Sequence, residues 1–186
     1  MNFNRHFEIV GKHAFLSASK YHWVNYDPEK LKSVYWNYRA AERGTELHDF
    51  ARRCIELGIR LPKSKNSLNQ FVNDAIGFRM APEQPLYFSD NCFGTTDAIA
   101  FDEKTNTLRI HDLKTGEIPA NPKQLEIYAA IFCLEYKKHP QELSIELRIY
   151  QSGEVQKHFP DPDDIQQIMN LIVQFDRIIE KEKLKG

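Results

Sequence analysis

The chain has few cysteines. Its only three, Cys54, Cys92 and Cys133, stand far apart in the sequence. A disulfide framework needs paired cysteines, and a structural zinc site needs thiolates or imidazoles grouped within a few residues. The isolated positions argue against both kinds of site.

The sequence also lacks any long apolar run. The opening ten residues have no apolar core of the kind found in a secretory signal, and no uninterrupted apolar stretch is long enough to cross a bilayer. We therefore expect a cytoplasmic protein with no membrane partner.

Internal repeats, low-complexity tracts and Ser/Gly-rich linkers are missing as well. A chain of 186 residues with 41% hydrophobic content can bury a sizeable core by itself. We expect one domain over residues 1–186. It would hold an N-terminal helical region over about 1–80, a sheet and helix over about 84–159, and a C-terminal helix over about 161–183.

An excess of positive charge is lacking too, since the net charge is −1. Duplex DNA is bound largely by lysine and arginine, which displace counterions from the phosphates. The charge is uneven, however, because residues 28–65 hold nine Lys/Arg against five Asp/Glu. This segment could form one wall of a DNA groove, with Arg52 one turn beyond His48. The alternative is a solvated helix of mixed charge.

Two runs rich in apolar and β-branched residues are present, Phe93–Phe101 and Thr107–Lys114. Each is typical of a strand, and the polar residues between them have turn chemistry, so the runs predict an antiparallel hairpin. Asp97 lies on the first strand. Asp112 and Lys114 share one face of the second, because side chains alternate along a strand.

Carboxylates that converge in this way repel each other unless a divalent cation lies between them. Oxygen ligands favour Mg²⁺ or Mn²⁺. A lysine two residues beyond a metal-binding aspartate can hold the water that attacks phosphorus and offset the negative charge of the transition state. The alternative is an ordinary hairpin with a surface Asp112–Lys114 pair.

The rest of the chain alternates helical and strand patterns. Asp27 is expected to cap the first helix, and Gly58 to end it. The expected helices are 29–57, 67–78, about 122–138 and the terminal helix opened by 161–164, and the further strands are 144–150 and about 154–159. The order helix, three strands, helix, strand predicts an α/β fold with a mixed central β-sheet flanked by helices.

Four short motifs occur in order: Gly44-x-x-x-His48, Gly94-x-x-Asp97, Asp112-x-Lys114-Thr-Gly and Gln124-x-x-x-Tyr128. Together they resemble the PD-(D/E)xK nuclease superfamily, in its RecB-like or phage-type exonuclease branch. The resemblance implies a restriction-endonuclease-like core of αβββαβ order.

The same resemblance implies a role for each motif residue. Asp97 and Asp112 would be metal ligands, His48 a nitrogen ligand and the Leu113 carbonyl a backbone ligand. Lys114 would be the catalytic lysine. Two further catalytic residues, Gln124 and Tyr128, would share a helix face at the edge of the site.

Two of these residues and Glu83 have plainer alternatives. His48 could be a structural or solvated residue, and Tyr128 could simply pack. If His48 is a ligand, Mn²⁺ should support activity at least as well as Mg²⁺. Glu83 resembles the acidic residue that often opens the preceding strand in the superfamily, but a turn carboxylate beside two prolines fits equally well. We leave Glu83 outside the expected site.

The implied function is a Mg²⁺- or Mn²⁺-dependent DNA nuclease, most simply an exonuclease of recombination or repair similar to stand-alone phage enzymes. Its substrate would be a duplex end or single-stranded DNA, and a homo-oligomer or a recombination partner protein is expected by analogy. The alternatives are a structure-specific endonuclease and a non-catalytic DNA-binding subunit. Some RecB-like nucleases hold a four-cysteine iron–sulfur cluster; three isolated cysteines predict no cluster here.

Overall fold

The computed structural model describes residues 14–116 and 118–185, except for the side chain of Ala41. The chain divides into two compact units, Met1–Thr45 and Glu46–Gly186. The expectation of a single domain stays a prediction.

The first unit holds the 3₁₀ segment η2 (Ala18–Asn25) and the first part of helix α1 (Pro28–Leu57). The ring of Phe15 contacts Tyr35 and Tyr38, with centroids 5.2 and 5.3 Å apart. Trp36 is 68% exposed. Some aromatic residues of this unit therefore pack on one another while others face solvent.

The two ends of α1 follow the signals expected from the sequence. The Asp27 carboxylate accepts a hydrogen bond from the Lys30 backbone N–H at 2.7 Å, which satisfies a free amide of the first turn. Gly58 follows the last helical residue with φ of +66°, a conformation that glycine adopts without strain.

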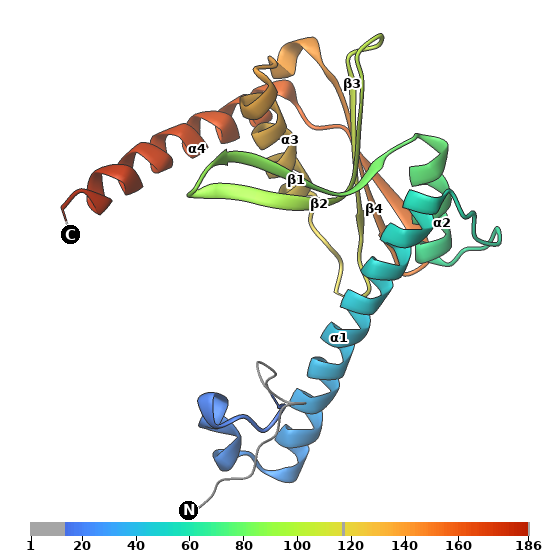
Figure 1. Cartoon of the computed structure of the whole chain (residues 1–186), viewed down its shortest axis with the longest axis vertical. Helices are drawn as coiled ribbons and strands as arrows, with labels where there is room; N and C mark the ends of the chain where they lie inside the picture. The colour runs from blue at the N-terminus through green and yellow to red at the C-terminus, as the bar shows by residue number, and fades with distance from the viewer. Residues whose placement is uncertain (1–13, 117, 186) are drawn as a thin grey trace, which may run out of the picture. The chain divides into compact units, whose positions relative to one another are not determined.

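The second unit is built on a five-stranded sheet in the order β1-β2-β3-β4-β5 (Figure 1). Only β3 and β4 run parallel, because α3 carries the chain between them, and the other neighbours are antiparallel. The expected α/β class and mixed sheet are confirmed, as is the β2–β3 hairpin. The strands are β1 (Ala81–Ser89), β2 (Cys92–Asp102), β3 (Thr107–Leu113), β4 (Ser144–Gln151) and β5 (Glu154–His158).

Helices cover the sheet and enclose two apolar clusters. Helices α3 (Lys123–Tyr136) and α4 (Pro162–Lys183) pack with one cluster, which includes Leu108 and Ile110 of β3. Helix α2 (Ser67–Gly77) and the end of α1 pack with the other, which includes Leu113. Alternate side chains of β3 therefore enter opposite clusters, as strand geometry requires. A short 3₁₀ turn, η3 (Pro140–Glu142), precedes β4.

Several element boundaries differ from expectation by a few residues. Lys114 follows β3 instead of ending it, and α3 ends at Tyr136 because Lys137 adopts a left-handed conformation. The larger difference is β1, which begins at Ala81 and so contains Glu83 between Pro82 and Pro85. Edge strands tolerate proline because one side of their backbone has no neighbour to bond. None of the helices in the described ranges is both long and apolar enough to span a membrane.

Candidate metal centre

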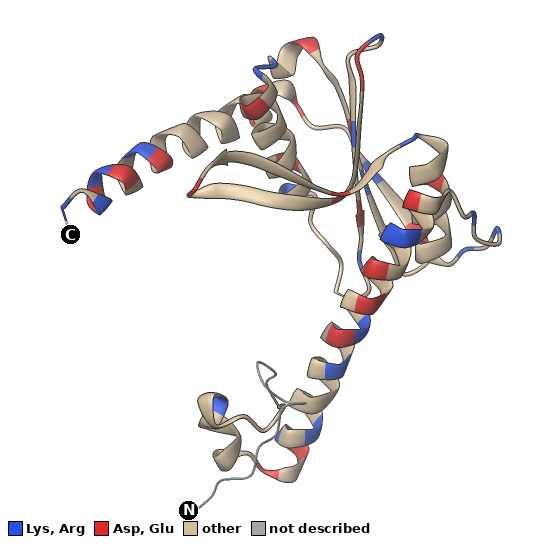
Figure 2. Ribbon diagram, viewed as in Figure 1, with Lys and Arg blue, Asp and Glu red and all other residues tan. Residues whose placement is uncertain are grey.

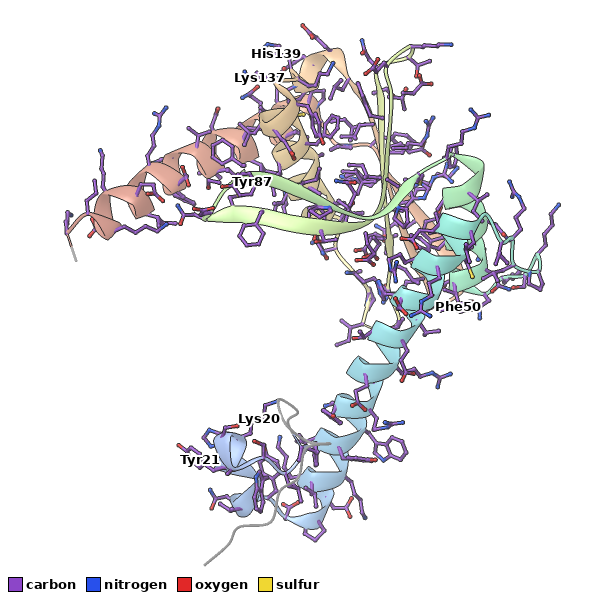
Figure 3. The ribbon with its side chains drawn as sticks, viewed as in Figure 1. Lys20, Tyr21, Phe50, Tyr87, Lys137 and His139 are labelled. Carbon is purple, nitrogen blue, oxygen red and sulfur yellow. The ribbon has the colours of Figure 1, made fainter. Side chains whose placement is uncertain are left out.

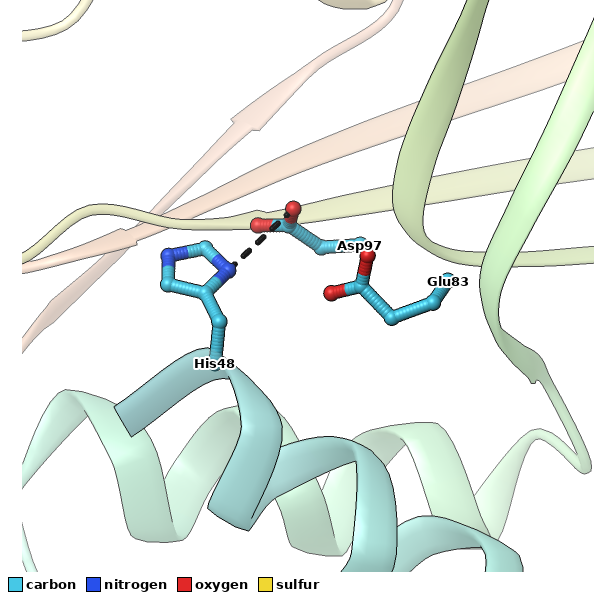
Figure 4. Close-up of side chains that lie close together, drawn as sticks. All are labelled: His48, Glu83 and Asp97. Atoms are coloured by element: carbon cyan, nitrogen blue, oxygen red, sulfur yellow. Dashed lines mark ion pairs between the residues drawn. The ribbon is translucent and has the colours of Figure 1, made fainter. Parts of the chain in front are cut away.

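Asp97 lies at the middle of the candidate site. Its Oδ2 accepts a hydrogen bond from the Leu113 backbone N–H at 2.7 Å, which fixes the carboxylate against β3. Its Oδ1 lies 3.4 Å from Nδ1 of His48 on α1 (Figure 4). The hairpin and α1 therefore bring together two residues that are 49 positions apart in the sequence.

Glu83 reaches the same place from β1. In the antiparallel register Pro82 pairs with Ala98 and Gln84 with Thr96, which sets Glu83 opposite Asp97. Its φ is +47°, an uncommon conformation for a residue with a side chain. Strain of this kind concentrates at functional sites, where the surrounding structure holds it.

His48, Glu83 and Asp97 form a group that could hold a metal ion. Each offers one ligand atom, and these atoms lie within 4.8 Å of one another (Figure 4). One imidazole and two carboxylates make a donor set that suits a divalent cation. Without a cation the two carboxylates would repel each other at this distance. The sequence placed His48 and Asp97 in the site and left Glu83 out.

Asp112 and Lys114 form the adjoining part of the site. Oδ2 of Asp112 lies 3.0 Å from Nζ of Lys114, and the Asp112 residue is 3% exposed. That ion pair lies outside hydrogen-bond geometry, and within the described residues Oδ2 has no hydrogen-bond partner. The cation that faces this buried oxygen is the Lys114 ammonium. Asp112 is not part of the compact three-residue group.

Lys114 is held from a second side by α3. Its Nζ donates a hydrogen bond to Oε1 of Gln124 at 3.0 Å, and Nε2 of Gln124 donates to the Tyr128 hydroxyl at 3.4 Å. The spacing of four residues sets both side chains on one helix face, as expected. No described contact tests the Leu113 carbonyl as a ligand, so that role stays a prediction.

Gly94 explains how the Tyr128 ring comes so near β2. A Cβ atom at Gly94 would lie 2.9 Å from Cε1 of Tyr128, closer than carbon atoms normally approach. The missing side chain therefore leaves room for the ring. A continuous series of contacts therefore runs from Gly94 to Asp112, through Tyr128, Gln124 and Lys114.

The electrostatics of the site follow from burial and crowded negative charge. Burial, and then the charge of Asp97, raise the pKa values of Asp112 and Glu83. A hydrogen bond to Asp97 is the largest cause of the raised pKa of His48, and the charges of Glu83 and Asp112 add to it. Without a cation, His48, Glu83 and Asp112 therefore keep their protons to a higher pH than the same side chains do in water.

These shifts predict that metal affinity rises with pH. A ligand must lose its proton to bind a cation, and all three raised pKa values oppose that loss. Affinity for Mn²⁺ should therefore fall as pH drops through the raised pKa of His48, by about tenfold per pH unit where one proton is displaced. Calorimetric titration of Mn²⁺ across neutral pH measures this. A pH-independent affinity would mean that these groups do not bind the ion.

Replacing Glu83 by glutamine is expected to weaken Mn²⁺ binding by about 10–100-fold, because the side chain keeps its shape but loses the charge that faces the ion. Calorimetry measures this affinity directly. The matched control is Glu103→Gln, an exposed carboxylate in the β2–β3 turn. Equal Mn²⁺ affinities in the two variants would show that Glu83 is not a ligand of the ion.

If the nuclease activity expected from the sequence motifs is present, replacing Gly94 by alanine should lower kcat on DNA by about tenfold or more, because small displacements of catalytic groups are costly. The new methyl group would push the Tyr128 ring and, through Gln124, disturb Lys114. Mn²⁺ affinity should stay near that of the wild type, since the atoms nearest the added Cβ all belong to Tyr128. Gly77→Ala is the control because nothing lies within 4 Å of its added Cβ. Unchanged kcat would show that this contact does not position Lys114.

Arg52, expected on the DNA-facing side of α1, is engaged with acidic neighbours instead. It lies 2.7 Å from Asp49 and 2.9 Å from Glu56, and Arg53 lies 2.9 Å from the same Asp49. Helical spacing of three and four residues makes these pairs local. At these positions α1 presents paired charges, as in the alternative of a helix with mixed charge.

Comparisons with known proteins add little. No family model matches the chain, and no curated protein sequence matches it. Among solved structures, the crystal structure of SSO0001 aligns over 78% of this chain at 12% sequence identity with a TM-score of 0.35. The alignment spans 64% of that structure's chain. A match this distant carries no argument about function.

Proposed function

We propose that this protein is a metal-dependent DNA nuclease that hydrolyses phosphodiester bonds. The observation that carries the proposal is the group of His48, Glu83 and Asp97 beside the Asp112–Lys114 ion pair. The sequence motifs that resemble the PD-(D/E)xK superfamily lend support, because they supply His48, Asp97, Asp112 and Lys114 in the order of that superfamily. An exonuclease of recombination or repair is the most economical form of the proposal.

His48, Glu83 and Asp97 would hold the cation, and the buried Asp112 carboxylate would be a further ligand of the same ion. A bound Mg²⁺ or Mn²⁺ would act as a Lewis acid that polarises the phosphate and makes water more acidic. Because His48 contributes an imidazole nitrogen, the site should bind Mn²⁺ at least as well as Mg²⁺.

Lys114 would act on the reacting phosphate. Asp112 and Gln124 hold its ammonium from two sides, so its position is fixed before substrate arrives. A preorganised positive charge stabilises the extra negative charge that develops on the phosphate oxygens. The Lys114 ammonium could also donate a hydrogen bond to the attacking water. That bond would leave a lone pair of the water directed at phosphorus.

The test is digestion of end-labelled linear DNA and closed circular DNA with Mg²⁺, Mn²⁺ or EDTA. An exonuclease degrades only the linear substrate, and only with metal. Cutting of the closed circle would favour an endonuclease, to be followed with branched DNA. Binding of DNA without cleavage under any of these conditions would contradict the nuclease and favour a DNA-binding subunit.

A further inference from the structure

The loop that joins α1 to α2 carries an unusual charge. From Gly58 to Asn73 the sequence contains three cationic residues, Arg60, Lys63 and Lys65, and no acidic residue. All three are exposed. In Figure 2 this loop beside α2 shows blue segments and no red ones.

These cations differ from those on α1. Arg52 and Arg53 are paired with acidic residues of their own helix. Within residues 14–116 and 118–185, no ion pair joins Arg60, Lys63 or Lys65 to a carboxylate. The three loop cations are therefore available to bind an anionic partner, as the positive balance of residues 28–65 suggested.

Polar side chains of α2 hold the first part of the loop in place. The Asn73 amide donates to the Leu61 carbonyl and accepts from the Leu61 backbone N–H, both at 2.9 Å. Asn69 donates to the Pro62 carbonyl at 2.9 Å and to the Ser64 hydroxyl at 3.0 Å. A loop fixed by such bonds loses little conformational freedom when it binds a partner.

The β4–β5 turn holds the other end. Nε2 of Gln70 donates to the carbonyls of Lys65 and Gly153, at 3.0 and 3.1 Å. A Cβ atom at Gly153 would lie 2.8 Å from the Lys65 carbonyl oxygen, and Gly153 has φ of +82°. Only glycine fits this turn against the loop without displacing it.

A pocket of about 320 Å³ opens at the loop, with Arg60, Lys63, Gln70 and Asn73 among its lining residues. Asp74 also lines it, and Oδ2 of its carboxylate accepts hydrogen bonds from Arg148 at 2.9 Å and from the Tyr150 hydroxyl at 2.8 Å. The pocket therefore presents two cations, neutral amides and one carboxylate whose charge Arg148 offsets, a set of groups that can bind a phosphodiester.

We propose that Arg60, Lys63 and Lys65 bind the phosphate backbone of DNA at a site separate from the metal centre. His48 and Gly58 are ten residues apart in the sequence, which corresponds to about 15 Å along the axis of α1. Duplex DNA rises about 3.4 Å per base pair, so a separation of this order corresponds to about four to five base pairs along a duplex. This proposal rests on the proposed function for the identity of the substrate.

The test is DNA binding as a function of salt, in EDTA, with Lys114→Ala as the background so that cleavage cannot interfere. Lys63→Ala with Lys65→Ala should weaken binding of a labelled 20-base-pair duplex about tenfold or more at low salt. The slope of log affinity against log salt should fall by about two, because two phosphate contacts are lost. An unchanged slope, or no binding by the background protein, would overturn the proposal.

The matched control replaces Lys104 and Lys137 by alanine. Both are exposed, and Figure 3 shows Lys137 beside His139, away from the loop that follows α1. This control should keep the slope of the background protein. An equal loss in loop and control variants would mean that charge alone matters, which also contradicts a defined site.

A second variant changes the shape of the loop but not its charge. Gly153→Ala should displace the Lys65 carbonyl and weaken duplex binding several-fold, with a smaller effect on the salt slope than the double lysine variant. Wild-type affinity in Gly153→Ala would contradict the role of the fixed loop.

The two proposals fail in different ways. If the protein binds duplex DNA through the loop but never cleaves it, only the nuclease proposal fails. If it cleaves DNA with an unchanged salt slope in the loop variant, only the loop proposal fails. The loop variant should also cleave a substrate of two or three nucleotides at the wild-type rate, because that substrate is too short to reach the loop.

Discussion

Replacing Lys114 by alanine is expected to reduce DNA cleavage by at least about 10²–10³-fold while Mn²⁺ affinity stays within a few-fold of the wild type. Nζ of Lys114 lies 3.0 Å from Oδ2 of Asp112, so it is beside the metal centre and not a member of it. Removing the ammonium takes away the charge that stabilises the transition state and leaves His48, Glu83 and Asp97 in place. Single-turnover cleavage and calorimetric Mn²⁺ titration measure the two effects separately.

The control for this variant is Lys104→Ala, an exposed lysine in the β2–β3 turn that should cleave normally. Because the ammonium also offsets the charge of Asp112, the variant could shift the pH at which Mn²⁺ binds, so affinity is compared at a pH above that transition. Cleavage retained by Lys114→Ala would show that the lysine is not catalytic, whatever its effect on metal binding.

Replacing Asp97 by asparagine is expected to abolish cleavage and to weaken Mn²⁺ binding by about 100-fold or more. Asp97 lies opposite Glu83 and contacts His48, so it links the ligands that come from β1 and α1. Asparagine keeps an oxygen that can accept the hydrogen bond from the Leu113 N–H, so the fold should persist.

Thermal unfolding separates metal binding from folding in this variant. The wild type should gain stability with Mn²⁺, because an ion that binds only the folded state raises its melting temperature. Asp97→Asn should not gain stability, and its metal-free melting temperature should equal or exceed the wild-type value because one repelling charge is gone. Asp102→Asn, on the same strand but exposed, should behave as the wild type does. A full Mn²⁺-dependent rise in Asp97→Asn would exclude Asp97 as a ligand.

The sequence predicts much of the fold because local signals agree with the tertiary structure. The β2–β3 hairpin follows from two β-branched runs around a polar turn, and the start of α1 follows from the Asp27 cap. Strand alternation predicts that Leu113 faces the apolar core, and it is 2% exposed. These features depend on neighbours in the sequence, which a single chain displays directly.

Glu83 could not be assigned in this way. Two flanking prolines suggest a turn, but β1 is an edge strand, and its register with β2 sets Glu83 opposite Asp97. The only signal in the sequence is an acidic residue shortly before the strand of Asp97. The assignment of Glu83 therefore depends on tertiary placement. Charge has a different limit: a count over residues 28–65 ignores the helical spacing that pairs Arg52 with Asp49 and Glu56 and leaves Lys63 unpaired among the described residues.

The most direct test of the central claim is the position of Mn²⁺ in crystals soaked with the ion, located by anomalous scattering. The proposed metal centre predicts a peak within bonding distance of His48, Glu83 and Asp97, and none in crystals of Asp97→Asn. A wild-type crystal with no peak there at saturating Mn²⁺, or with its peak bound by other residues, would contradict the proposed centre and the nuclease mechanism built on it.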